Sequence, residues 1–141
     1  VSDSSLAQLV RLMREFYAVE KLSFHEEVAT FALRKMLLDP GLGSAYLVLL
    51  EKEVVGYFVL TYCFSLEFHG KFALLDELYI REAYRKQKLG KSVVEFCEEV
   101  CKKMGIKTLR LEVSQENAVA QKLYYGMGFK QEPRLLFTRW M

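Results

Sequence analysis

The order in which helical and strand-like patterns follow one another constrains this chain more than any other feature of its sequence. Two segments with apolar residues at helical spacing come first, three strand-like segments follow, and the two patterns then alternate. A meander of strands followed by a strand–helix–strand crossover predicts an α/β (α+β) chain whose mixed sheet carries helices on both faces. The expected helices are residues 4–20, 23–38, 88–103 and 117–125, and the expected strands are residues 45–51, 54–64, 72–80, 108–113, 129–131 and 135–140.

The bulk composition limits what kind of protein this is. The chain has 141 residues, the size of one domain, and its 52% hydrophobic content predicts a folded core rather than disorder. With 20 basic and 18 acidic residues the net charge is only +2, so no global field favours nucleic acid or an anionic membrane as a partner. We therefore expect one domain over residues 1–141, and any attraction for phosphate must be local.

Cysteine and histidine usage bears on location and on metals. Three cysteines, an odd number without CxxC spacing, are typical of reduced thiols, and no apolar run approaches the ~20 residues of a membrane span. His25 and His69 lie far apart without other ligands at metal-binding spacing. We expect a cytoplasmic protein that uses no metal and has no membrane partner.

The most informative passage runs from Asp76 to Lys91, where a strand, a short loop and a helix start succeed one another. A helix N-terminus presents unpaired N–H groups and a positive dipole end, so cations are normally disfavoured there. Four basic residues nevertheless gather at this end, which indicates a bound anion: Arg85, Lys86, Lys88 and Lys91. The GxxxxGK[ST] phosphate loop and the GxGxxG dinucleotide fingerprint are both absent.

Two motifs in this region and downstream of it resemble the GNAT superfamily of N-acetyltransferases. The family has Q/R-x-x-G-x-G/A at the head of the helix after its central strand, and this chain has Arg85-x-x-Lys88-x-Gly90, with lysine in place of the first glycine. The family's downstream signature N-x-x-A-x-x-x-Y-x-x-x-G-F is matched at every position from Asn117 through Tyr124 to Phe129.

The resemblance covers residues 4–140 in element order and implies the GNAT fold, with a mixed central sheet of six to seven strands and about four helices on both faces. Family members open with a strand before the first helix. Only residues 1–3 remain for it here, so we expect that strand to be truncated or rudimentary.

The resemblance also implies acetyl-CoA as cosubstrate and assigns residues to it. The backbone N–H of Leu78 is expected to face the thioester carbonyl, and Tyr124 is expected to protonate the leaving thiolate, because a phenol stays protonated at neutral pH. Asn117 is expected to contact the cofactor arm or to cap its own helix. The remaining expected cofactor contacts are Tyr79 and Ile80 with the pantetheine arm, and Arg85, Lys86, Gln87, Lys88, Leu89, Gly90 and Lys91 with the pyrophosphate.

An alkyl ammonium must lose a proton before it attacks a thioester, and Asp76 and Glu77 are the candidate bases. Since successive strand residues point to opposite faces, only one of them is expected to reach the site. The stretch 75–80 and the Glu15-Phe16-Tyr17 region are similar to the diamine and polyamine acetyltransferase branch, which favours a small amine or polyamine as acceptor.

Two alternatives stay open at this level. The first is acetylation of a protein or peptide amine, because the sequence does not define the depth of the acceptor pocket. The second is a non-catalytic acyl-CoA-binding module, which lysine at position 88 supports and an intact Tyr124 disfavours. A nucleic-acid partner is not expected, whereas a homodimer is compatible with the family resemblance.

Overall fold

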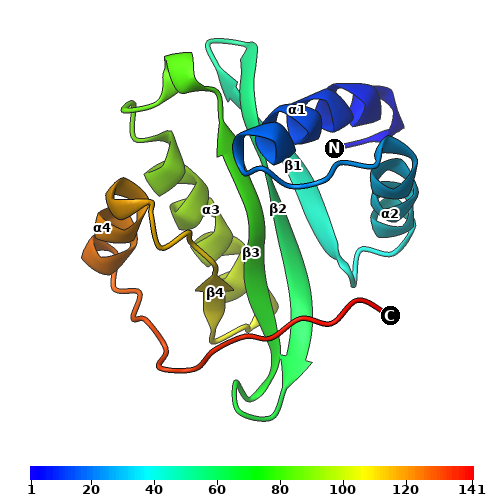
Figure 1. Cartoon of the computed structure of the whole chain (residues 1–141). Helices are drawn as coiled ribbons and strands as arrows, with labels where there is room; N and C mark the ends of the chain where they lie inside the picture. Colours follow the sequence, from blue (N-terminus) through cyan, green and yellow to red (C-terminus); the bar gives the residue numbers. More distant parts are fainter.

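A computed structural model describes all 141 residues, Val1–Met141. Four α-helices and two short 3-10 helices surround one four-stranded sheet (Figure 1). None of the helices combines the length and the apolar character that a membrane span requires. In chain order the elements are η1 (Asp3–Ser5), α1 (Leu6–Val19), α2 (Glu26–Leu38), β1 (Gly43–Leu50), β2 (Glu53–Ser65), β3 (Gly70–Ile80), η2 (Glu82–Tyr84), α3 (Leu89–Met104), β4 (Leu109–Leu111) and α4 (Ala118–Gly126).

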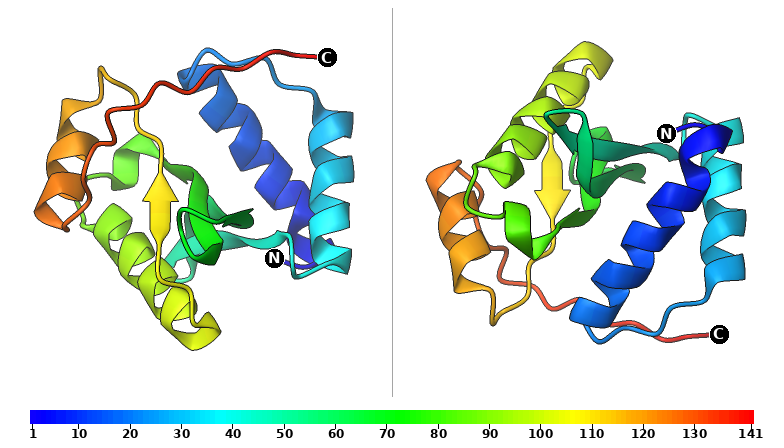
Figure 2. Two further views of the ribbon diagram at one scale, coloured as in Figure 1. Left: turned by 90° about the horizontal axis from the view of Figure 1, so that it is seen from below. Right: turned by 90° about the horizontal axis from the view of Figure 1, so that it is seen from above.

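The sheet has strand order β1-β2-β3-β4. The first three strands form the predicted antiparallel meander, and β4 adds in parallel to β3 after the α3 crossover. Helices α1 and α2 cover one face of the sheet, and α3 and α4 lie on the other (Figure 2). The predicted mixed sheet with helices on both faces is therefore confirmed.

Each face of the sheet has its own apolar core. Leu9 and Leu12 of α1 are fully buried on one side, where they pack with Tyr57 and Val59 of β2. On the other side Val94 and Cys97 of α3 pack with residues of β2 and β3. Because alternate residues of β2 point to opposite faces, this central strand contributes to both cores and is almost entirely buried along its middle.

The expected number of strands was wrong. The sheet has four strands rather than six or seven. At the start of the chain, η1 replaces the expected first strand, and the Val1 ammonium group donates a 2.9 Å hydrogen bond to the carbonyl oxygen of Ala45 in β1. At the other end, residues 129–131 and 135–140 form no strand, although their β-branched and aromatic pattern predicts two.

Candidate functional site

An opening between β3 and β4 organises the site. The two strands pair only from Ala73↔Leu109 to Leu75↔Leu111, yet β3 continues to Ile80. Over Asp76–Ile80 the strand therefore has β2 on one side and no strand on the other (Figure 1). Backbone N–H and C=O groups along that edge are free to bind an extended ligand, as an added strand would.

The loop after β3 leads into a helix start that has no side-chain cap. Lys88 occupies the N-cap position in the left-handed conformation, with φ 61° and ψ 21°, and a lysine side chain cannot accept a hydrogen bond. The first helical bond runs from the Ser92 N–H to the Lys88 carbonyl oxygen at 3.1 Å. The N–H groups of the preceding turn, residues 89–91, have no intrahelical acceptor and can bind an anion.

Basic side chains surround this helix start, as the sequence predicts. Lys86, Lys88 and Lys91 are exposed, and Lys86 also has a positive φ of 66°. Arg85 instead folds back, and its Nε donates a 2.9 Å hydrogen bond to the carbonyl oxygen of Ile80. The guanidinium thereby ties the loop to the end of β3, and its other N–H groups remain available to a ligand.

Asn117 begins helix α4 as its cap. Its side-chain Oδ1 accepts a 3.1 Å hydrogen bond from the backbone N–H of Ala120, which accounts for the asparagine at the first position of the N-x-x-A pattern. Of the two roles that the sequence left open for Asn117, the structure shows the capping role.

The remainder of that motif ends the same helix. The N–H of Phe129 bonds to the carbonyl of Tyr124, and the N–H of Gly128 bonds to the carbonyl of Tyr125, with Gly128 at φ 93°. These two bonds define a Schellman motif, in which the left-handed position favours glycine. Neither bond uses the hydroxyl of Tyr124.

Tyr124 and Leu78 lie on the same face of the sheet, where both are partly buried against the α3 core. No hydrogen bond to the protein affects the Tyr124 hydroxyl, and burial alone raises the pKa of this phenol above its ordinary value of 10. Gly90 brings the start of α3 close to α4, because a methyl group there would lie 3.5 Å from Leu123 Cδ2. The phenol, the free edge of β3 and the uncapped helix start thus belong to one region.

A β-bulge in β3 changes where the two candidate acids point. Val59 pairs with Glu77 but its neighbour Leu60 pairs with Leu75, so Asp76 is an extra residue in the strand. Leu75 packs on the α3 face, and Glu77 reaches the α1 face. The simple alternation expected across residues 75–77 is therefore interrupted.

The Glu77 carboxylate accepts two tyrosine hydrogen bonds on the α1 face. The Tyr17 hydroxyl lies 2.6 Å from Oε2, and the Tyr57 hydroxyl lies 2.7 Å from Oε1. Burial raises the pKa of both phenols above the usual range, and the negative charges of Glu77 and Asp76 raise them further. Both acids therefore act on the same pair of hydroxyls. Sequence reasoning named the Tyr17 region but not this pairing, and Tyr57 was indistinguishable from any other strand aromatic.

Asp76 lies among further negative charge. Its pKa is raised by partial removal of water and then by the charges of Glu77 and Glu112, the residue that follows β4. No basic side chain forms an ion pair with any of these three acids. Glu112 carried no signal in the sequence, because its proximity to Asp76 depends on the pairing of β3 with β4. No group of three or more potential ligand side chains is arranged to hold a metal ion.

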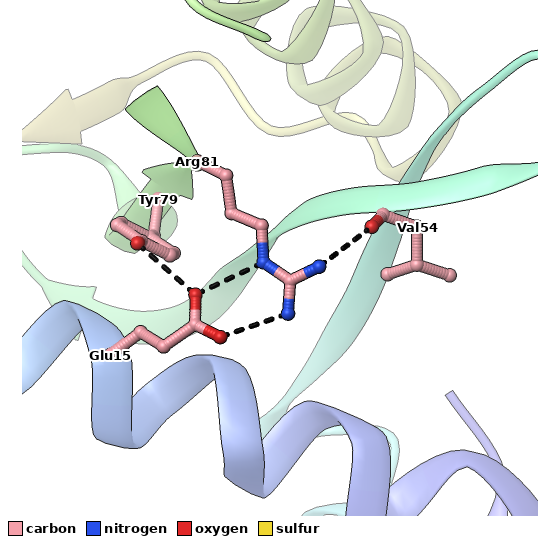
Figure 3. A network of polar contacts seen from close by, with 4 residues as sticks. All are labelled: Glu15, Val54, Tyr79 and Arg81. Atoms are coloured by element: carbon pink, nitrogen blue, oxygen red, sulfur yellow. Dashed lines mark hydrogen bonds and ion pairs between the residues drawn. The ribbon is translucent and has the colours of Figure 1, made fainter. Parts of the chain in front are cut away.

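A second polar network joins α1 to the end of β3 (Figure 3). The Arg81 guanidinium binds both carboxylate oxygens of Glu15, at 3.0 Å from Nε and 2.8 Å from Nη2, and the Tyr79 hydroxyl adds a 3.2 Å bond. Arg81 Nη1 also donates to the carbonyl oxygen of Val54 at 3.4 Å. The Arg81 interaction is the main cause that lowers the pKa of Glu15.

The cysteines take no part in this region. Cys97 and Cys101 lie in the α3 core, where burial raises the pKa of the Cys97 thiol to about 12. A thiol that remains protonated at neutral pH is a poor nucleophile. Both residues serve as small side chains of the α3 core.

Comparison with known proteins agrees with this geometry. The acetyltransferase (GNAT) family matches residues 6–129. A thialysine N-epsilon-acetyltransferase from Bos taurus is 28% identical over 89% of this chain and 79% of its own. A spermidine N(1)-acetyltransferase from Thermoplasma acidophilum is 40% identical, but over 43% of this chain and only 37% of its own length.

Solved structures have the same fold. An integron cassette protein from the mobile metagenome of Cole Harbour Salt Marsh superimposes with a TM-score of 0.85 and 29% identity, over 98% of this chain and 86% of its own. A predicted acetyltransferase from Clostridium acetobutylicum, crystallised with acetyl-CoA, has a TM-score of 0.84 at 12% identity, over 99% and 92% of the two chains. The resemblance found in the sequence is confirmed: the chain is an acetyl-transferring enzyme that belongs to the acetyltransferase (GNAT) family.

Proposed function

We propose that this protein transfers the acetyl group of acetyl-CoA to a primary amine by direct attack, with a small amine or polyamine as the favoured acceptor. The observation that carries the proposal is the opening between β3 and β4. The uncapped basic start of α3 and the Tyr124 phenol lie on one face of the sheet at this opening. The Glu77 carboxylate, which has no basic partner, lies on the other face. The relatives named for spermidine and thialysine support the diamine and polyamine branch.

Acetyl-CoA is proposed to bind along the free edge of β3. Backbone groups of Leu78, Tyr79 and Ile80 would hold the pantetheine arm as an added strand. The pyrophosphate would accept hydrogen bonds from the unpaired N–H groups of residues 89–91, with Arg85, Lys86, Gln87 and Lys88 around it. The Lys88 backbone takes the left-handed conformation that glycine adopts most easily, so lysine at this motif position keeps the loop conformation at a cost in backbone strain.

The reaction uses three groups of this chain. The amine nitrogen attacks the thioester carbon, and the Leu78 N–H would stabilise the negative charge that develops on the carbonyl oxygen. As the C–S bond breaks, the Tyr124 hydroxyl would give its proton to the thiolate. Asp76 or Glu77 would take the proton of the attacking ammonium, directly or through water. As the tetrahedral intermediate collapses, the nitrogen would lose its second proton, which would return through water to the Tyr124 phenolate. Acetyl amide, free CoA thiol and the one proton held by the base are the products.

An amine panel tests this proposal. Acetyl-CoA consumption and the mass of the acetylated product are measured with spermidine, thialysine and a peptide that has an N-terminal alanine. Acetylation of the small amines supports the favoured acceptor class. Acetylation of the peptide alone would favour the runner-up, for which the [ribosomal protein bS18]-alanine N-acetyltransferase of Escherichia coli offers support at 36% identity over 42% of this chain. Turnover of none of them would reject the proposal.

We also infer that residues 1–141 act as one cytoplasmic domain that forms a homodimer. The segment 135–141 exposes five large apolar side chains, at relative accessibilities from 79% to 107%: Leu135, Leu136, Phe137, Trp140 and Met141. Just before it, Arg134 forms a bidentate ion pair with Glu67 in the β2–β3 turn. The segment has a strand-like sequence and pairs with no strand of this chain. A second copy of the chain would cover its exposed apolar side chains.

A further inference from the structure

Glu77 is held from two independent elements. Tyr17 belongs to α1 and Tyr57 to β2, and each hydroxyl bonds to a different oxygen of the carboxylate. A carboxylate has room for about four hydrogen bonds, so each oxygen keeps a lone pair for a ligand N–H. Tyr57 is fully buried, Tyr17 and Glu77 are half-buried, and no arginine or lysine neutralises the acid. The side chain is thus fixed in orientation while it remains able to bind a cation.

The second network joins α1, the helix that carries Tyr17, to the end of β3, and Figure 3 shows its Glu15 and Arg81. Glu15 lies two residues before Tyr17 on α1 and is bound bidentately by Arg81, which directly follows β3. The Arg81 backbone N–H also donates to the Val55 carbonyl oxygen at 2.9 Å, so the arginine is fixed to β2 as well. Because two nitrogens of the planar guanidinium bind the two oxygens of Glu15, this pair restricts the position of α1 more than a single hydrogen bond would.

We propose that Tyr17 and Tyr57 are positioning residues that fix the Glu77 carboxylate toward the acceptor amine, and that the Glu15–Arg81 pair keeps α1 and hence Tyr17 in place. This inference rests on the proposed function and adds residues to its acceptor side. Glu77 directly precedes Leu78 but points to the opposite face of the sheet. An amine that approaches the thioester from the α1 side would meet this carboxylate first, already oriented.

The two tyrosines act only through Glu77, and that sets the expected kinetics. Tyr17→Phe removes one charge-assisted hydrogen bond and leaves the ring packing with Phe16 and Phe24 intact. The expected result is a fall of about tenfold in kcat/KM for the amine, by the usual strength of a hydrogen bond to a charged group. The KM for acetyl-CoA stays unchanged, because the hydroxyl lies on the other face from Leu78 and Tyr124.

A double-mutant cycle tests the inference with the best acceptor amine found in the panel. The variants are Tyr17→Phe, Glu77→Gln and the double variant, with Tyr57→Phe as a second probe and Tyr125→Phe as matched control. Tyr125 is exposed on α4, and its hydroxyl contacts only Gln131. If Tyr17 acts through Glu77, the double variant is no worse than Glu77→Gln alone. An equal loss in both backgrounds would overturn the inference and leave the acetyltransferase proposal standing.

Two further measurements are needed to interpret the double-mutant cycle. Thermal unfolding identifies any variant, above all Tyr57→Phe, whose loss comes from misfolding. If Glu77→Gln has no measurable turnover, calorimetry can measure the Kd of the amine for the CoA complex of each variant, and the same cycle is built from these Kd values. Additive effects of the two substitutions on the binding free energy would also overturn the inference. If the wild-type protein acetylates no amine, the proposed function fails, and this inference fails with it.

Discussion

Phe129 and Tyr124 are joined twice at the end of α4. The N–H of Phe129 donates a 3.0 Å hydrogen bond to the carbonyl oxygen of Tyr124, and the two rings pack edge to face with centroids 5.8 Å apart. Both contacts involve the backbone or the ring of Tyr124, and neither uses its hydroxyl. The helix end and the proposed proton donor can therefore be separated by a single-atom change.

Tyr124→Phe is expected to retain the fold and lose turnover. The ring and the helix-ending bonds stay, so the melting temperature should change little. Loss of the proton donor should lower kcat by about 10²–10⁴-fold, the usual contribution of a general acid. Calorimetry should find an unchanged Kd for CoA. Wild-type turnover in this variant would remove the proposed role of Tyr124.

Replacement of Lys88 separates backbone strain from charge. A residue other than glycine in the left-handed region costs about 1 kcal/mol or slightly more, so Lys88→Gly should raise the free energy of unfolding by up to about 1 kcal/mol. Lys88→Gln keeps the strain and should not raise it. Both variants lose the same charge, so CoA binding should weaken alike and depend less on salt. Urea unfolding measures the free energy of unfolding of both variants. An equal gain in Lys88→Gln and Lys88→Gly would contradict the assignment of backbone strain to Lys88.

Asp76→Asn should make the protein more stable at neutral pH. The folded protein raises the pKa of Asp76 above its ordinary 3.8, so the ionised carboxylate destabilises the fold at neutral pH. The variant should gain at most about 1 kcal/mol at pH 7, since the side chain is partly exposed. That gain should disappear as the pH falls below 3.8, where the acid is protonated in both states. Unfolding curves at several pH values check it, and a loss of stability at pH 7 would contradict it.

The Glu15–Arg81 pair should show the opposite pH dependence. Arg81 lowers the pKa of Glu15 from 4.5, so the pair stabilises the fold above that pH, and its contribution is lost as the pH falls through the lowered value. Both side chains are 39% exposed, so Glu15→Gln should cost only about 1 kcal/mol or less at pH 7. Wild type and variant should converge in acid, and a constant gap in thermal unfolding would argue against the ionic origin.

Removal of residues 135–141 tests the proposed homodimer. The segment lies outside both apolar cores, so the shortened chain should fold. Light scattering coupled to size exclusion should report a dimer for the whole chain and a monomer after truncation. Replacement of Arg134 by Gln, which breaks only the exposed ion pair with Glu67, should leave the dimer formed. A monomeric whole chain would reject this inference.

Local patterns were enough to predict most elements. Residues 4–20 and 88–103 were expected as helices, and α1 and α3 occupy Leu6–Val19 and Leu89–Met104. The expected strands 45–51 and 54–64 correspond to β1 and β2, which form an antiparallel hairpin. These elements follow from periodicity and turn chemistry, which act between near neighbours in the sequence.

Features that depend on distant partners were not predictable in this way. The segment 135–140 has strand-like residues, but a strand forms only where another strand edge is available, and β4 spans just three residues. The bulge at Asp76 cannot be recognised in the apolar pattern of β3, although it moves Glu77 to the α1 face. The Tyr17–Glu77 bond joins residues 60 positions apart, which no spacing rule reveals. The motifs located the cofactor side, whereas the acceptor side required the folded chain.

A crystal structure of the protein with CoA tests the central claim most directly. We expect the pantetheine arm along the free edge of β3, the pyrophosphate at the N–H groups of residues 89–91, and the CoA sulfur within hydrogen-bond reach of the Tyr124 hydroxyl. CoA bound with its pyrophosphate away from residues 85–91, or with its thiol remote from Tyr124, would contradict that claim.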